Sequence, residues 1–418
     1  MNKDFYINNR KKLVDSIKDN ALVILHSGFV FQNSGDQDFP FSVNRNFYYL
    51  TGIDQDDVIL VITKTAGKVN EALFIEENDP VLVKWIGAKL EKDEASDLSG
   101  IDNVYYKEQF DNYIFNVINP SRRNYNVIEN CYLDLERRKD LAFLPWPFKF
   151  SKRFSRDYPE IKIENVYSNI IKLRMYKTKE EIGLIKDSIL TTQKALEKVM
   201  HNLKEGMFEY QIESYFDQAI KYDGQKPHSF KTICASGKNA TILHYTANNS
   251  KINKGDLVLF DLGCHTDYYI SDISRTYPAN GKFSERQKQI YEIVLNCNKE
   301  CIKFLKPGVS WQEYNNFANS LLIAGLKKIG LIKEDKELEK YYWHSVGHSI
   351  GLDTHDPTLA NLKFSEGMLT TVEPGLYLED EGIGVRIEDN VLITKDGCIN
   401  LSAGIIKEVC DIEKFMAK

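Results

Sequence analysis

The chain has 418 residues, of which 43% are hydrophobic and 27% are charged, an ordinary composition for a soluble globular protein. Its formal net charge of −6 provides no basic surface for nucleic acid or for an anionic membrane. The chain is longer than one hydrophobic core usually supports, so we expect two domains.

The N-terminus and the cysteines indicate the compartment. Residues 1–6 already contain charged side chains, and the N-terminus lacks the apolar run of a signal peptide. The sequence contains no apolar stretch near the length of about 18 residues that a transmembrane helix needs. Seven cysteines, an odd number, argue against a disulfide framework. We therefore expect a cytoplasmic protein.

The first part of the chain predicts a small α/β domain. Residues 9–20 have the apolar spacing of an amphipathic helix, and residues 21–25, 58–63 and 71–75 are apolar runs of strand length. Strands separated by helical and polar stretches are typical of α/β architecture. Residues 36–52 are unusually aromatic for a loop, and an aromatic stripe is more often core than a ligand-binding surface.

The second part predicts an α+β domain. We place the boundary so that the domains span residues 1–172 and 173–418. Thr178-Lys-Glu-Glu181 and Ser284-Glu-Arg-Gln287 are capping boxes that open helices. Strand-like segments lie between them, within residues 232–245.

Two stretches of the second domain repeat each other at a nearly fixed offset. Residues 254–263 match residues 366–375 at an offset of 112. The matched pairs are Gly255 and Gly367, Leu257 and Leu369, Asp261 and Glu373, and Gly263 and Gly375. Farther along, Asp272 matches Glu388 at an offset of 116, as if the second copy had a longer hairpin. Two such copies related by a pseudo-two-fold axis would bring four carboxylates to one centre.

Three histidines, His344, His348 and His355, lie within twelve residues. The helical zinc motif of metalloproteases needs a glutamate directly after its first histidine, and Ser345 stands there instead. Glycines and β-branched residues favour a strand, in which positions four apart share a face. Both His344 and His348 can then point into one cavity, and the spacing leaves open which of them is a ligand.

Four carboxylates in one cleft cannot all stay ionised unless cations neutralise them. Two divalent ions fit this charge. A donor set rich in oxygen, with one imidazole and no thiolate, favours Mn²⁺, with Fe²⁺, Co²⁺ and Zn²⁺ as alternatives. Paired metal ions can share a bridging hydroxide during hydrolysis.

These motifs resemble the pita-bread metallopeptidases, and within them the Xaa-Pro aminopeptidases, nearly from end to end. The resemblance is carried by residues 239–245, 261–263, 344–356, 373–375 and 386–388, and in the first domain by residues 46–52 and 85–87. It implies a pita-bread catalytic domain with internal pseudo-two-fold symmetry, preceded by a smaller α/β domain. Ser42-Val43 departs from the Arg-Gln of many relatives, close to Asp36.

The resemblance also implies a role for each site residue. The implied metal ligands are Asp261 on one ion, Asp272 and Glu388 bridging both ions, and His348 and Glu373 on the second ion. The implied substrate contacts are His244 and His355 with the substrate and tetrahedral intermediate, His344 in the proline pocket, and Arg386, which is found in proline-specific members. We expect Glu373 also to carry the proton to the leaving nitrogen.

The implied function is removal of the N-terminal residue from peptides with proline in second position, by attack of a metal-bridging hydroxide. Two alternatives stay open. A prolidase would hydrolyse Xaa-Pro dipeptides with the same ligands, whereas a non-enzymatic peptide-binding relative should lack one or more ligands. The resemblance further implies a homodimer or homotetramer in which a neighbour's first domain narrows the cleft.

Overall fold

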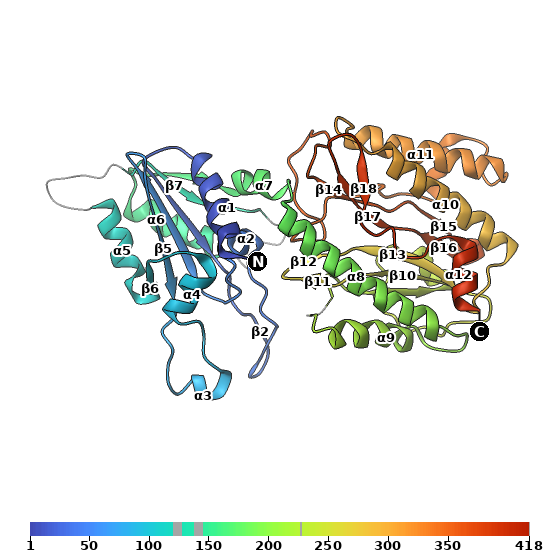
Figure 1. Ribbon diagram of the computed structural model, residues 1–418, viewed down its shortest axis with the longest axis horizontal. Coiled ribbons are helices and arrows are strands. Elements are labelled where there is room, and N and C mark those ends of the chain that lie inside the picture. The colour runs from blue at the N-terminus through green and yellow to red at the C-terminus, as the bar shows by residue number, and fades with distance from the viewer. Residues whose placement is uncertain (120–127, 138–144, 226–227, 418) are drawn as a thin grey trace. The chain divides into compact units, whose positions relative to one another are not determined.

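The computed structural model describes residues 1–119, 128–137, 145–225 and 228–417, and it divides into two compact units, residues 1–174 and 175–418 (Figure 1). The boundary predicted after residue 172 lies inside helix α7 (Tyr167–Arg174) and stays a prediction. Among the described residues, no helix combines the length and apolar character needed to cross a bilayer.

The first unit is built on a six-stranded mixed sheet in the order β6-β5-β4-β1-β7-β8. Its strands are β1 (Ala21–His26), β4 (Ile59–Thr65), β5 (Lys68–Ile75), β6 (Val104–Tyr106), β7 (Asn130–Leu133) and β8 (Lys162–Asn165). Strand β1 pairs antiparallel with β4 and parallel with β7. The predicted strands at 21–25, 58–63 and 71–75 are therefore confirmed as β1, β4 and β5, with small shifts at their ends.

Alternate residues of β1 face a large apolar core. Leu22 and Ile24 pack with Phe110 from α5 (Phe110–Ile118) and with Phe150 from α6 (Trp146–Asp157). This alternation is expected, since successive side chains of a strand point to opposite faces of the sheet.

For the first unit, one predicted helix is present with shifted bounds, and one predicted loop was wrong. The helix expected at residues 9–20 is α1 (Lys3–Asp15), which begins earlier because the Asn2 side chain accepts a hydrogen bond from Asp4 N. The expected aromatic loop contains helix α2 (Arg45–Thr51). The Asn44 side chain caps α2 by accepting from Phe47 N at 2.9 Å, and Gly52 ends it with a φ of +72°. The aromatic side chains of α2 are core, as predicted.

The remaining elements of the first unit lie outside the sheet. They are the hairpin β2 (Gln32–Ser34) and β3 (Gln37–Asp38), the helices α3 (Val83–Ile86) and α4 (Lys92–Ser99), and a 3-10 turn at Lys107–Gln109. The only long helix among these, α4, ends at Gly100 in the left-handed region and packs against α1.

The second unit holds two three-stranded sheets that match each other. The first sheet is β9 (Ile233–Ser236), β10 (Leu257–Leu262) and β13 (Ile273–Pro278), and the second is β14 (Leu369–Val372), β17 (Asp389–Ile393) and β18 (Cys398–Asn400). Strands β10 and β14 begin at positions related by the offset of 112, and β13 and β17 begin at positions related by the offset of 116. The pairs β10–β13 and β14–β17 are both antiparallel. The predicted repeat is therefore present in the fold.

Short hairpins connect the strands of each copy. They are β11 (His265–Thr266) with β12 (Tyr269–Ile270) in the first copy, and β15 (Gly375–Leu378) with β16 (Ile383–Arg386) in the second. The second hairpin is longer, which explains why the offset grows from 112 to 116. Residues 242–245, predicted as strand-like, form no strand and follow the 3-10 turn at Gly237–Thr241.

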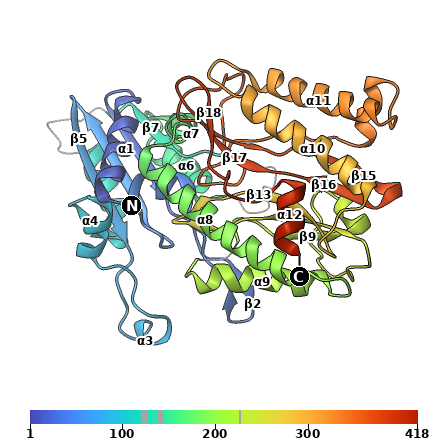
Figure 2. The same ribbon diagram turned by 45° about the vertical axis from the view of Figure 1, so that its right-hand side comes forward.

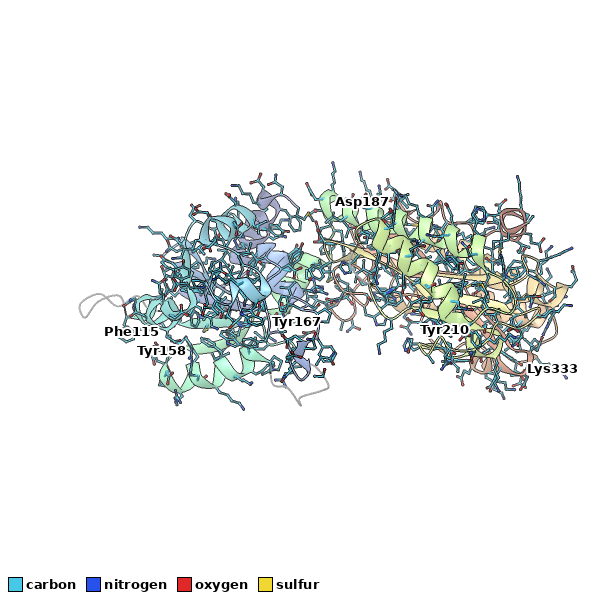
Figure 3. The ribbon with its side chains drawn as sticks, turned by 90° about the horizontal axis from the view of Figure 1, so that it is seen from below. Phe115, Tyr158, Tyr167, Asp187, Tyr210 and Lys333 are labelled. Carbon is cyan, nitrogen blue, oxygen red and sulfur yellow. The ribbon has the colours of Figure 1, made fainter. Side chains whose placement is uncertain are left out.

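Helices cover the strands of the second unit in pairs. They are α8 (Lys179–Asn202), α9 (Glu209–Tyr222), α10 (Glu285–Phe304), α11 (Trp311–Lys328) and the C-terminal α12 (Val409–Met416). The pairs α8–α9 and α10–α11 lie on opposite sides of the strands (Figures 1 and 2). Both predicted capping boxes are present, at Thr178 and Ser284. Asp187 on α8 and Tyr210 on α9 are exposed on the outer side (Figure 3).

Candidate metal centre

Each copy of the repeat places two carboxylates at the ends of its strands. Asp261 lies near the end of β10, and Asp272 directly precedes β13. Glu373 directly follows β14, and Glu388 directly precedes β17. The two residues that precede strands are almost fully buried, with Asp272 4% and Glu388 1% exposed. The repeat thus delivers four acids from equivalent positions, as its offsets predict.

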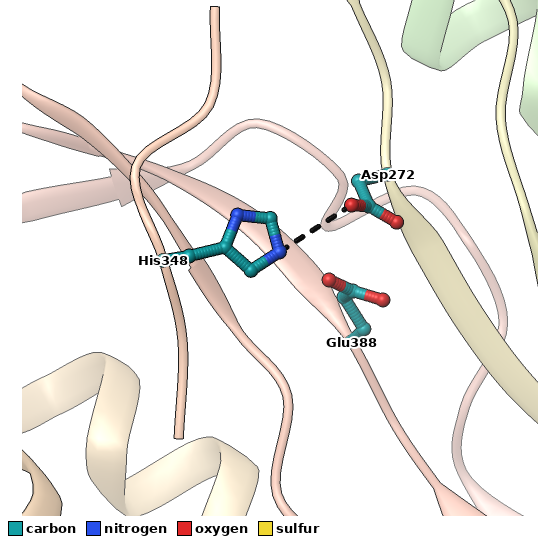
Figure 4. Close-up of side chains that lie close together, drawn as sticks. All are labelled: Asp272, His348 and Glu388. Carbon is teal, nitrogen blue, oxygen red and sulfur yellow. Dashed lines mark ion pairs between the residues drawn. The ribbon is translucent and has the colours of Figure 1, made fainter. Parts of the chain in front are cut away.

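His348 faces Asp272 and Glu388 (Figure 4). Its Nε2 lies 3.5 Å from Asp272 Oδ2 and 3.4 Å from Glu373 Oε1. Asp272, His348 and Glu388 each offer a donor atom within 4.8 Å of the other two. His348 Nδ1 lies 3.1 Å from Ser349 O, and a carbonyl only accepts, so Nδ1 carries the proton and the Nε2 lone pair faces the acids.

Three acids of this centre, Asp272, Glu373 and Glu388, have raised pKa values. Burial, and then the neighbouring acid Asp261, raises the pKa of Asp272 well above its ordinary value. Burial, followed by Asp272, does the same to the pKa of Glu388, and burial raises the pKa of Glu373 to about 8. Within the described residues, Asp261 Oδ1 and Glu388 Oε1 are buried without a hydrogen-bond partner. Buried carboxylate oxygens without a hydrogen-bond partner are suitable ligands for divalent cations.

The segment that carries His344 and His348 is irregular, so the predicted strand was wrong. Thr371 N donates to His348 O at 2.9 Å, and only Ser349 forms an isolated bridge, with Thr370. His348 N donates to the side chain of Thr371 at 3.0 Å, which breaks the backbone ladder. A Cβ on Gly347 would lie 2.2 Å from Thr371 O, so glycine is required for this close approach.

A second polar cluster joins the carboxylates on one side. Tyr377 OH lies 2.9 Å from His344 Nε2 and accepts from Arg386 Nη1 at 3.0 Å. Arg386 Nη2 donates to Asp261 Oδ2 at 2.6 Å, and Arg386 is only 3% exposed. Burial, and then the charge of Arg386, lowers the pKa of His344 to about 4. His344 is therefore neutral at pH 7.

The other two predicted histidines lie at the same centre. The rings of His355 and His348 are 4.2 Å apart in a T-shaped arrangement. Burial, and then the proximity of His244, lowers the pKa of His355. His244 is exposed, and its charge also lowers the pKa of His344. All nine predicted site residues therefore lie in the second unit.

Sequence reasoning missed several side chains at this centre, namely Tyr377, Thr371, Ser274 and Asn390. Tyr377 links His344 to Arg386, but a tyrosine in a strand carries no signal of such a role. Ser274 and Asn390 are related by the same offset of 116 as the acids, and this relation could have identified them. Asp36 and Trp85 belong to the first unit, and Trp85 is 82% exposed.

Four carboxylates and one imidazole converging on a buried centre are typical of metal-dependent hydrolases. Comparison with known proteins makes this class specific. Residues 183–395 match the model of metallopeptidase family M24, and residues 6–127 match the aminopeptidase P N-terminal domain. The chain belongs to metallopeptidase family M24.

The following relatives are similar over nearly the whole of this chain. The Xaa-Pro aminopeptidase of Escherichia coli K12 is 31% identical over 97% of this chain and 96% of its own. Human Xaa-Pro aminopeptidase 3 is 30% identical over 99% of this chain and 86% of its own. A solved Bacillus anthracis structure has a TM-score of 0.97 at 47% identity, covering 100% of this chain and 98% of that one. E. coli aminopeptidase P with the inhibitor Pro-Leu has a TM-score of 0.90 at 28% identity, with the same coverage. The predicted pita-bread architecture with an N-terminal domain is confirmed.

Proposed function

We propose that this protein is an Xaa-Pro aminopeptidase, a metal-dependent hydrolase that removes the first residue of a peptide whose second residue is proline. The observation that carries the proposal is the contact between the carboxylate centre and the Tyr377, His344 and Arg386 cluster, through the ion pair of Arg386 with Asp261. The names of the relatives, which span nearly the whole chain, support the same activity.

The proposed ligands are the five residues of the centre. Asp261 would hold one divalent ion, His348 and Glu373 the other, and Asp272 and Glu388 would bridge both. We favour Mn²⁺ because the donors are four carboxylates and one imidazole without a thiolate. When bound, the ions would lower the pKa of a water molecule and polarise the scissile carbonyl.

Glu373 is proposed to move the proton. Its carboxylate would take a proton from the attacking water and deliver it to the leaving prolyl nitrogen. Positioned acid–base catalysis of this kind is typically worth about 10²–10⁴-fold in rate. A Glu373→Gln variant that kept its metal ions and most of its turnover would rule out this role.

The remaining residues are proposed to select proline. A peptide bond to proline has no N–H, so the site must recognise the ring and the carbonyls. Neutral His344 would pack against the ring, while His244, His355 and Arg386 would hold carbonyl or carboxylate oxygens. The free α-amine of the substrate would meet the acids around Asp261, which fixes cleavage at the first residue.

One assay tests the activity against its alternatives. The purified protein with Mn²⁺ is offered Xaa-Pro-Yaa, Xaa-Pro and Xaa-Ala-Yaa peptides side by side. The proposal expects the proline tripeptide to be hydrolysed best. Preference for the dipeptide would indicate a prolidase, preference for Xaa-Ala-Yaa would contradict proline specificity, and no hydrolysis would indicate a binding protein.

We also propose a homodimer or homotetramer in the cytoplasm. The seven cysteines are free thiols, which is consistent with a reducing compartment. Light scattering coupled to size exclusion would give the oligomeric state, and a monomer would refute it. Fractionation of cells with an antibody to the chain would test the location.

A further inference from the structure

Ser274 and Asn390 occupy the same position in the two copies of the repeat. Ser274 lies two residues after Asp272, and Asn390 lies two residues after Glu388. The side chains of both are fully buried, at 0% exposure. Buried polar side chains are retained where they make hydrogen bonds that the fold or the site needs.

The side chain of Ser274 holds Glu388, the acid of the other copy, by its carboxylate. Its hydroxyl donates to Glu388 Oε2 at 2.8 Å and accepts from Arg386 Nε at 2.8 Å. Its carbonyl accepts from Glu388 N at 3.0 Å. One Glu388 oxygen is thus fixed by Ser274, and the other, Oε1, is the buried oxygen without a protein partner.

The side chain of Asn390 holds Asp272, the acid of the first copy, by the backbone of Asp272. Its Oδ1 accepts from Asp272 N at 3.1 Å, and its Nδ2 donates to Asp272 O at 2.7 Å. The difference between the two contacts follows from side-chain length. Glutamate has one more rotatable bond than aspartate, so its carboxylate gains more from being held directly, whereas fixing the backbone of Asp272 leaves its shorter side chain less freedom.

We propose that Ser274 and Asn390 are reciprocal positioning residues, each fixing the bridging acid of the other copy, and that they thereby set the affinity of the centre for its metal ions. This inference rests on the metal ligands named under the proposed function. Partners that orient a metal ligand by hydrogen bonding typically change metal affinity about 10–100-fold when they are removed.

The test measures metal binding directly. The full-length chain is stripped with a chelator and titrated with Mn²⁺ by calorimetry, and thermal unfolding is recorded for each variant. Ser274→Ala and Asn390→Ala should each raise the Kd for Mn²⁺ about 10–100-fold. The matched control is Ser188→Ala, which removes an equally buried hydroxyl that donates to Tyr269 O at 2.7 Å and bonds neither the four acids nor the histidine of the centre. Its Kd should equal that of the wild type, even where its Tm falls.

A conservative variant separates positioning from folding. Ser274→Thr keeps the hydroxyl and should return the Kd toward the wild-type value. If alanine at either position prevents folding, the neutral variants Ser274→Cys and Asn390→Thr, which nearly keep the side-chain volume, should weaken Mn²⁺ binding in the same direction. Wild-type affinity in folded variants of both positions would overturn the inference. A wild-type chain that bound no Mn²⁺ would instead overturn the proposed function, so the two failures are distinguishable.

Discussion

A buried ion pair beneath the site offers the sharpest test of how the loop from His348 to His355 is held. Lys177 Nζ lies 2.9 Å from Asp356 Oδ2, and both side chains are only 1% exposed. Asp356 N donates to Ser349 O at 2.9 Å, so the pair fastens both ends of this loop. We predict that Lys177→Met destabilises the second unit, because the variant leaves a buried carboxylate without its cation.

The magnitude follows from the burial of the pair. Removing one partner of a fully buried ion pair typically costs about 3–5 kcal/mol. For a unit of this size each kcal/mol shifts Tm by about 2–4 °C, so Tm should fall by about 6–20 °C. The double variant Lys177→Met/Asp356→Asn removes both charges of this buried pair and should recover at least half of this loss.

The assay is urea unfolding followed by circular dichroism, with calorimetry for Tm. The matched control is Lys303→Met, which breaks the exposed pair of Lys303 with Glu300 in the same unit, at 70% and 37% side-chain exposure. An exposed pair is worth about 0–1 kcal/mol. A loss of less than about 1 kcal/mol in Lys177→Met, equal to that of the control, would refute the reasoning.

Three further predictions concern other parts of the chain. Burial raises the pKa of Asp134 to about 6, above its unfolded value of about 3.9, so the free energy of unfolding should fall by about 2 kcal/mol between pH 4 and pH 7. Asp134→Asn should flatten this part of the profile in urea titrations, and an unchanged profile would contradict the assignment. Arg386→Lys should lose about 1–3 kcal/mol in kcat/KM on Xaa-Pro-Yaa while keeping its metal ions, because lysine cannot copy the planar fork; a wild-type rate would refute this. Asp272→Ala and Glu388→Ala should each lose both metal ions in elemental analysis, and two tightly bound ions in either variant would refute bridging.

The acids of the centre could be predicted from sequence because a repeat carries geometric information. Equivalent positions in two copies of one unit must lie at equivalent places about a symmetry axis, so Asp261 with Glu373 and Asp272 with Glu388 converge. The internal repeat alone was enough to predict that these four acids lie together. The capping boxes were predictable for a similar reason, since their hydrogen bonds are local in sequence.

What the sequence could not predict depends on contacts between distant residues. The segment of His344 and His348 has strand-like composition, but the Thr371 side chain interrupts its pairing. The choice of His348 over His344 as the residue facing the acids likewise depends on where this segment lies beside β14. Helix α2 was missed because aromatic residues have modest helix propensity, and burial of its aromatic face outweighs that preference.

The two copies contribute unequally to the site, and this inequality explains how a symmetric scaffold can act on an asymmetric substrate. Each copy supplies two acids, but His344, Tyr377 and Arg386 all belong to the second copy. The position equivalent to Arg386 in the first copy is Ile270, which cannot pair with an acid. Within the part of the chain that the structure describes, the Arg386 side of the centre therefore combines a cation with neutral hydrogen-bonding groups. In the proposed reaction, His344 and Arg386 would receive the proline and its carbonyl, and the acids around Asp261 would receive the amine, which gives the peptide one direction of binding.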